Sequence, residues 1–172
     1  MHSREAFLSA IFVVFCAVPI ANAASAVTVQ SESLKPWSVP SEVNVEHKEI
    51  TFSSKGARLR GTLYFASSAQ HRPAVVVLHG ASSPSSNLPL YRHLEEILPP
   101  LGINVFVFDR RGSGASEGGG EDSYNFDILA DDGIAAATAL GSDEHVDRNH
   151  IGYWGISQGG WLALLAASKD AK

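Results

Sequence analysis

A serine flanked by two glycines is the first feature of this sequence that could carry out chemistry. Gly155, Ser157 and Gly159 form a G-x-S-x-G pattern, with a short apolar stretch on each side of it. A strand that turns sharply into a helix exposes such a serine, and glycines remove the side chains that would collide in the turn. The helix N-terminus also favours negative charge there. The pattern therefore predicts a nucleophilic serine; an ordinary turn with Ser157 as a helix N-cap is the structural alternative.

A second segment could supply the donors that attack on a carbonyl requires. Such attack creates an oxyanion, which two backbone N–H groups stabilise. One is the N–H of the residue after the nucleophile, here Gln158. We expect the other from Ala81, because Gly80 lets the chain bend and aim the next N–H inward. Gly80 and Ser82 are the competing donors. His79 is a candidate base, but it precedes the serine and we interpret it as structural.

A glycine-rich segment, DRRGSGASEG (109–118), follows a predicted strand. Gly112-x-Gly114 suggests a dinucleotide site, but the next glycine, Gly118, has the wrong spacing for G-x-G-x-x-G. The sequence also lacks a G-x-x-x-x-G-K-[ST] loop and an H-E-x-x-H motif. We therefore expect no cofactor and no metal site.

Hydrophobic periodicity predicts a hairpin followed by three strand–helix units. The expected strands lie at 47–52, 58–65, 73–78, 103–108 and 151–154. The expected helices follow the apolar spacing at 90–101, where Pro99 and Pro100 limit the helix, at 126–140 and at 159–168. The unbroken apolar run at 74–78 is typical of a strand buried on both faces of a parallel sheet, and 103–108 is expected to be a second buried strand. The last helix is apolar nearly all round, which predicts burial, whereas Asp131 and Asp132 are expected on the solvent side of theirs. This order predicts an α/β fold with a mostly parallel sheet and an N-terminal antiparallel hairpin.

Composition and the N-terminus set the broad class. The chain has 172 residues and a formal net charge of -5, which fits one globular domain and argues against a nucleic-acid surface. Residues 1–23 have a charged start, a short apolar run and a small-x-small end at Ala23, as in a signal peptide. We expect cleavage there, a flexible leader over 24–42, a domain over 43–172 and a secreted or periplasmic protein.

Two alternatives concern the same N-terminal run. An uncleaved membrane anchor is one, although the run is short for a span of about 20 residues, so we expect no stable membrane span after cleavage. Lipidation of Cys16 is the other, and the bulky Phe15 before it argues against it. Cys16 is the only cysteine, so the mature chain would hold no disulfide and no cysteine nucleophile.

The hairpin, the His79-Gly80 loop, the segment 109–114 and the Gly155–Gly159 pattern together resemble the α/β-hydrolase superfamily in order and spacing. The resemblance runs from about Val43 to the chain end. The DRRGSGxSEG and GxSQGG runs are similar to its branch of Xaa-Pro dipeptidyl-peptidase-like, serine-aminopeptidase-like and esterase enzymes. The resemblance implies a Ser–His–Asp hydrolase of esters or amides. It implies Ser157 as nucleophile and Gln158 and Ala81 as oxyanion donors.

The triad itself is incomplete in this sequence. In the superfamily the acid and then the histidine follow the serine, but after Ser157 only Asp170 is acidic and no histidine follows. We expect both groups beyond Lys172, a sheet incomplete at its C-terminal side, and a chain that is inactive and poorly soluble as printed. The leading hypothesis is a serine hydrolase acting on a small-molecule ester, or second on an amide or peptide. The alternatives are an exported aminopeptidase or dipeptidyl-peptidase-like enzyme and a non-catalytic binding protein.

Overall fold

The structure is a computed structural model that describes residues 43–67, 71–82 and 84–170. The predicted signal peptide at 1–23 and the predicted leader at 24–42 lie outside these residues. Within the described ranges, no helix combines the length and the apolar character that crossing a membrane requires.

The N-terminal part of the domain is an antiparallel hairpin, as predicted. It consists of β1 (Val45–Ser54) and β2 (Ala57–Ala66). The two residues between them, Lys55 and Gly56, have φ angles of 46° and 78°. Left-handed backbone at both positions of a two-residue turn matches the twist of the flanking strands, and glycine adopts it without strain.

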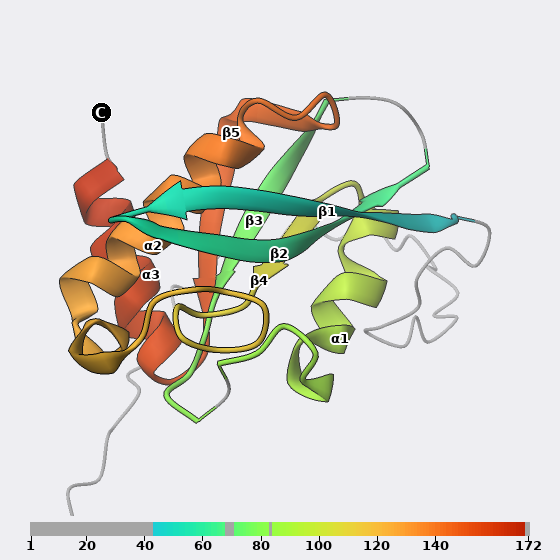
Figure 1. The fold of residues 1–172 in the computed structure, drawn as a ribbon. Coiled ribbons are helices and arrows are strands. Elements are labelled where there is room, and N and C mark those ends of the chain that lie inside the picture. Colours follow the sequence, from blue (N-terminus) through green and yellow to red (C-terminus); the bar gives the residue numbers. More distant parts are fainter. Residues whose placement is uncertain (1–42, 68–70, 83, 171–172) are drawn as a thin grey trace, which may run out of the picture. The chain divides into compact units, whose positions relative to one another are not determined.

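The hairpin extends a sheet of five strands in the order β1-β2-β4-β3-β5 (Figure 1). The remaining strands are β3 (Arg72–Leu78), β4 (Asn104–Phe108) and β5 (Val146–Gly155). β3 lies between β4 and β5 and is parallel to both, whereas β2 runs antiparallel to β4. The sheet is therefore mixed, with a parallel part of three strands and β5 at its edge.

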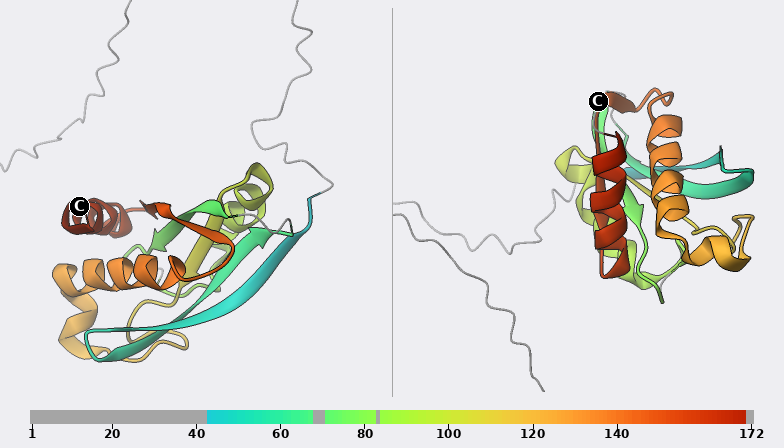
Figure 2. Two further views of the ribbon diagram at one scale, coloured as in Figure 1. Left: turned by 90° about the horizontal axis from the view of Figure 1, so that it is seen from above. Right: turned by 90° about the vertical axis from the view of Figure 1, so that its left-hand side faces the viewer.

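Helices cover both faces of the parallel strands (Figure 2). They are α1 (Pro89–Ile97), which leads into the 3-10 helix η1 (Pro99–Leu101), α2 (Phe126–Leu140), preceded by the 3-10 helix η2 (Gly120–Tyr124), and α3 (Gln158–Asp170). Val77 of β3 packs toward α1, while Val76 and Leu78 pack toward α2 and α3. The central strands are thus buried on both faces, which confirms the prediction from their apolar runs.

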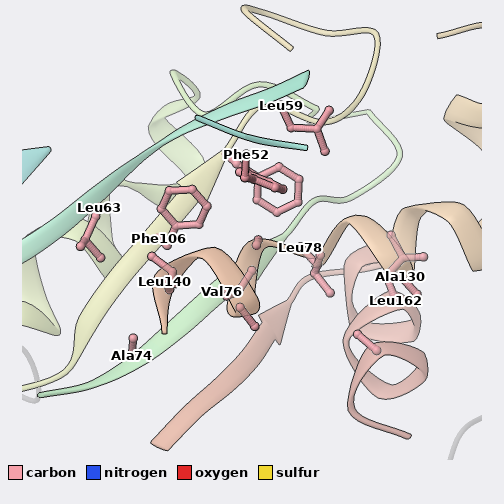
Figure 3. Close-up of a cluster of buried hydrophobic side chains, with 14 of the residues drawn as sticks. Phe52, Leu59, Leu63, Ala74, Val76, Leu78, Phe106, Ala130, Leu140 and Leu162 are labelled. Atoms are coloured by element: carbon pink, nitrogen blue, oxygen red, sulfur yellow. The ribbon is translucent and has the colours of Figure 1, made fainter. Parts of the chain in front are cut away.

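The larger core lies between the sheet and the pair α2 and α3. Aromatic side chains from β1 and β4 meet aliphatic side chains from β3 and the two helices there. Figure 3 shows its members Phe52, Val76, Phe106, Leu140 and Leu162. Burial of apolar area on this scale, at about 25 cal/mol per Å², is the main force that holds the helices on the sheet.

The last helix departs from the prediction of full burial. Leu162 and Ala166 of α3 are buried, but Trp161 and Leu164 are each 69% exposed. The helix follows β5, the edge strand, so its outer face extends past the sheet and no described residue covers it.

The position of Asp132 was also predicted wrongly. Its side chain is buried, and its two oxygens accept hydrogen bonds from Arg111 Nε at 2.9 Å and Arg111 Nη2 at 2.6 Å. The same guanidinium donates to the carbonyl of Ser54. Asp131, one residue earlier, is nearer the surface and pairs with Lys55 and Lys169. Asp132 therefore anchors the segment after β4 to α2, because a buried charge requires a partner of opposite sign.

Candidate active site

Three loops meet at one edge of the sheet because β3, β4 and β5 are parallel. Leu78 lies opposite Gly155, and Val77 lies opposite Val107. The residues that follow these strands, His79, Asp109 and Ser157, are therefore brought to the same edge. In a parallel α/β sheet the carboxyl ends of the strands are where ligands bind.

The turn between β5 and α3 has the tight geometry that the glycine pattern predicts. Ser157 has a φ of 56°, in the left-handed region that residues with side chains rarely adopt. A Cβ on Gly155 would lie 2.0 Å from the carbonyl oxygen of Gly159, and a Cβ on Gly159 would lie 2.0 Å from the carbonyl oxygen of Leu78. Both positions therefore require glycine, and the exposed serine is held at the start of α3.

The N–H of Gln158 is available at the first position of α3. The next two N–H groups, of Gly159 and Gly160, donate to the carbonyls of Ile156 and Ser157. An N–H at the first turn of a helix has no partner inside the helix and can bind an anion. This placement supports Gln158 as an oxyanion donor.

The predicted second donor, Ala81, lies in an exposed turn directly after Gly80. The backbone of Leu78 and His79, where this loop begins, packs against Gly159 of the serine turn. The structure therefore brings the start of the loop to the serine, and the choice among Ala81, Gly80 and Ser82 stays a prediction.

His79 has the surroundings of a structural residue. Its ring is buried against Tyr91 and Phe108, and Nε2 donates to the carbonyl of Phe108. Burial lowers the pKa of His79 to about 4, although the bond to Phe108 opposes the shift. The imidazole is therefore neutral at neutral pH, and its Nε2 is bound to the last residue of β4.

Asp109, the first residue after β4, ties the neighbouring loops together. Its Oδ1 accepts from the N–H and the hydroxyl of Ser86, each at 2.7 Å, and from the Ser85 hydroxyl, while Oδ2 accepts from the N–H of Ala115 at 2.7 Å. Burial raises the pKa of the Asp109 carboxyl, but these hydrogen bonds outweigh it and leave the pKa below its ordinary value. Gly114 makes room for the carboxylate, since a Cβ there would lie 2.1 Å from Oδ2.

Arg110, which sequence reasoning did not single out, contacts the serine turn directly. Its Nη1 donates to Oε1 of Gln158 at 2.8 Å, and its Nη2 donates to the carbonyl of Ser123. Its backbone N–H donates to the carbonyl of Pro84. The signal that could have found it is a charged residue two positions after a buried strand, at the edge where the serine also lies.

The groups that would complete a triad are not found among the described residues. Asp170 accepts a hydrogen bond from the hydroxyl of Tyr153 at 2.8 Å. It ends α3, about 18 Å along the helix from its start at 1.5 Å per residue, so it cannot orient a base beside Ser157. In the ranges that the structure describes, no histidine hydrogen-bonds to Ser157, and no group of three His, Cys, Asp or Glu side chains is arranged to hold a metal ion.

A hollow of about 560 Å³ lies between β5 and α3. Its lining includes Trp154, Gly155, Leu164 and Asp170, on the outer side of the edge strand. Ser157 does not line it, so this hollow is a feature of the uncovered sheet edge rather than a substrate pocket.

Comparison with protein families assigns this chain to a family. The family described as serine aminopeptidase, S33, matches residues 69–172, which include the His79 loop, the glycine-rich segment and the serine turn. The chain belongs to this family. Its fold is that of the α/β hydrolases, as the sequence resemblance predicts.

Individual relatives show what this chain is similar to. The thiohydrolase aneE of Aspergillus aculeatus is 31% identical over 127 residues, which cover 73% of this chain and 39% of the relative. The polyketide transferase grgF of Penicillium sp. is 32% identical over 124 residues, covering 68% and 38% of the two chains. This chain therefore spans about two fifths of the length of these curated relatives.

Solved structures agree in fold. The α/β hydrolase GrgF from Penicillium sp. sh18 superposes with a TM-score of 0.65 at 28% identity, covering 73% of this chain and 42% of that one. A hyperthermophilic esterase from the archaeon Pyrobaculum calidifontis superposes with a TM-score of 0.58 at 25% identity, covering 72% and 38%. Hydrolases of esters are therefore among the proteins that share this arrangement of strands and helices.

Proposed function

We propose that this chain carries the nucleophile of a serine hydrolase that cleaves carboxylic esters or thioesters of small molecules. The observation that carries the proposal is the backbone of Ser157, held left-handed between two glycines that tolerate no Cβ. Such strain persists where a function requires it, and here it presents a hydroxyl at a helix N-terminus. The thiohydrolase and esterase relatives support the ester and thioester classes.

The proposed reaction has two acyl-transfer steps. Ser157 Oγ attacks the substrate carbonyl, its proton passes to a base, and the negative charge forms on the carbonyl oxygen beside the N–H of Gln158. The C–O or C–S bond then breaks, and the alcohol or thiol leaves with a proton. Water attacks the acyl-serine in the same way and releases the carboxylic acid. We propose that the base is a histidine, oriented by an acid, and that both come from polypeptide outside residues 1–172.

Labelling with a fluorophosphonate tests the nucleophile. In the full-length protein we expect the probe to modify Ser157, as read by mass spectrometry of the labelled peptide, and Ser157→Ala to abolish labelling. Ser168→Ala is the matched control, since this exposed serine lies on the same helix and should label like the wild type. A full-length protein that folds and stays unlabelled would favour the non-catalytic binding protein.

The origin of the base is tested by comparing chain lengths. We expect the full-length protein to react and the 172-residue chain to show no burst of activated-ester hydrolysis, because no described histidine contacts Ser157. A normal burst from the 172-residue chain would refute an external base.

Acyl transfer to an acceptor other than water is a second candidate, favoured by the similarity to the polyketide transferase grgF. The same acyl-serine would then be attacked by an alcohol or amine. Product analysis with an added alcohol distinguishes a transferase from a hydrolase, because a transferase yields a new ester and a hydrolase yields mainly acid.

Peptidase activity, which the family description suggests, is tested by comparing the rates of hydrolysis of an aminoacyl anilide and of the matching ester.

Export of the protein through residues 1–23 also stays a proposal. N-terminal sequencing of the protein recovered outside the cytoplasm should begin at Ala24. A mature protein that retains Met1 would contradict cleavage.

A further inference from the structure

Arg110 is a buried cation whose contacts are all neutral. The residue is 6% exposed, and its guanidinium donates to the side-chain amide of Gln158 and the carbonyl of Ser123. It forms no ion pair with a described carboxylate, and its Nε has no hydrogen-bond partner among the described residues. The neighbouring Arg111, by contrast, is paired with Asp132. Because a buried charge without a counter-ion is costly, this arrangement requires an explanation other than stability.

The contacts of Arg110 connect the two sides of the proposed oxyanion hole. Its side chain holds Gln158, the residue whose backbone N–H is the first donor. Its backbone N–H holds Pro84, in the loop that carries the second donor. The adjacent Asp109 fixes the same loop through Ser86. A donor must lie within a few tenths of an ångström of its optimal place to stabilise a transition state, so these contacts act on catalytic geometry.

We propose that Arg110 is a positioning residue of the oxyanion hole, which it orders by clamping the side chain of Gln158. The proposal rests on the proposed function of Ser157. The residue acts through Gln158 and does not touch the substrate. Its positive charge, which no carboxylate neutralises at hydrogen-bond distance, also favours an anion on this side of the serine turn.

The test is the rate of fluorophosphonate labelling in the full-length protein, since the phosphonyl oxygen occupies the same place as the oxyanion. Arg110→Met keeps the apolar stem and should label at least about tenfold more slowly, a smaller loss than the roughly 100-fold or more for removal of a donor itself. Gln158→Ala keeps the backbone N–H and should show a similar loss. The double variant should be no slower than the slower single variant, because both remove one contact. Arg92→Met, at an exposed position of α1, should label like the wild type.

A second readout separates positioning from a general loss of structure. With an activated ester, kcat per labelled serine should fall in Gln158→Ala while KM stays unchanged, because the contact acts in the transition state. Thermal unfolding establishes that each variant is folded. If Arg110→Met does not fold, Gln158→Ala still tests whether the contact between Arg110 and Gln158 affects catalysis.

Folded variants that label at the wild-type rate, or single losses that multiply in the double variant, would overturn the role of Arg110 alone. A wild-type protein that is never labelled at Ser157 would overturn the proposed function and this inference with it.

Discussion

At the scale of single residues, the serine turn is built by steric exclusion. Ser157 and Lys55 are the two non-glycine residues with positive φ in the described part of the chain, and Lys55 lies in an ordinary hairpin turn. At Ser157 the strain, about 1–3 kcal/mol, is maintained by packing of Gly159 against the end of β3. The position of Ser157 therefore depends on the absence of two side chains.

Replacing one of these glycines should disable the turn. Gly159→Ala should destabilise the fold by about 1–3 kcal/mol or more, because the new methyl group would overlap the carbonyl of Leu78, and it should abolish labelling of Ser157. Urea unfolding and fluorophosphonate labelling measure the two effects. Gly152→Ala is the control, because a Cβ at Gly152 meets no atom within 4 Å. Equal behaviour of the two variants would contradict the steric account.

The buried imidazole of His79 should make the free energy of unfolding depend on pH in the acidic range. Its pKa is about 4 in the folded protein and about 6.5 when unfolded, so between these values the unfolded chain binds a proton that the folded chain does not. The stabilisation by neutral His79 is complete above pH 6.5, and about 3 kcal/mol of it is lost as the pH falls to 4. His79→Gln should flatten the pH dependence of the free energy of unfolding in this range.

The control for this experiment is His93→Gln, at an exposed histidine of α1. It should keep the wild-type pH dependence. A His79→Gln variant with the same slope as the wild type would show that His79 does not bind its proton differently in the two states.

At the scale of elements, the segment after β4 is the connecting part of the site. Within three consecutive residues, Asp109 binds the loop after β3, Arg110 binds the start of α3, and Arg111 binds α2. The segment therefore links the elements that position Ser157. Its glycines, such as Gly114, allow the backbone to wrap closely around the Asp109 carboxylate.

The buried pair of Arg111 and Asp132 should be costly to break. Asp132→Asn removes one charge and leaves the other buried, which should lower the free energy of unfolding by about 3–5 kcal/mol. The matched change one residue earlier, Asp131→Asn, removes pairs with partly exposed lysines and should cost about 1 kcal/mol or less. Urea unfolding of both variants measures the difference, and similar losses would show that burial of the pair is energetically unimportant.

At the scale of the whole sheet, β5 is one of the two edge strands of the described structure, at the opposite edge from β1. The outer face of α3 presents Trp161 and Leu164, and Leu164 lines a hollow of about 560 Å³ between this helix and β5. Unpaired backbone groups on an edge strand, next to apolar side chains, favour pairing with other chains.

The 172-residue chain by itself should therefore self-associate. Leu164→Lys should reduce association in size-exclusion chromatography or light scattering, because it places a charge on the apolar face of α3. Leu101→Lys changes an exposed leucine of η1, on another part of the molecule, and should leave association unchanged. If both variants behaved alike, the edge of the sheet would not be the surface responsible.

Sequence reasoning located the hairpin, the central strands, the helices and the serine turn because each depends on neighbouring residues. Apolar periodicity and paired glycines are local patterns, and they record which face is buried and where the backbone must bend. The same reasoning failed for Asp132 and for the outer face of α3. A carboxylate on a helix is expected to be exposed to solvent unless its buried partner is known. An apolar helix is expected to be buried on all sides unless the order of the strands shows that it lies at an edge of the sheet.

The sequence by itself determined the α/β class, Ser157 as candidate nucleophile and the resemblance to α/β hydrolases. Only the tertiary structure decided which polar side chains meet. Arg110 and Gln158 are 48 residues apart, and Arg111 and Asp132 are 21 apart. The Arg111–Asp132 contact exists because α2 packs against the sheet. The Arg110–Gln158 contact exists because β4 and β5 flank β3 in parallel, which brings their carboxyl ends to one edge. That order follows from packing of helices on both faces of the sheet, and no local pattern of residues encodes it.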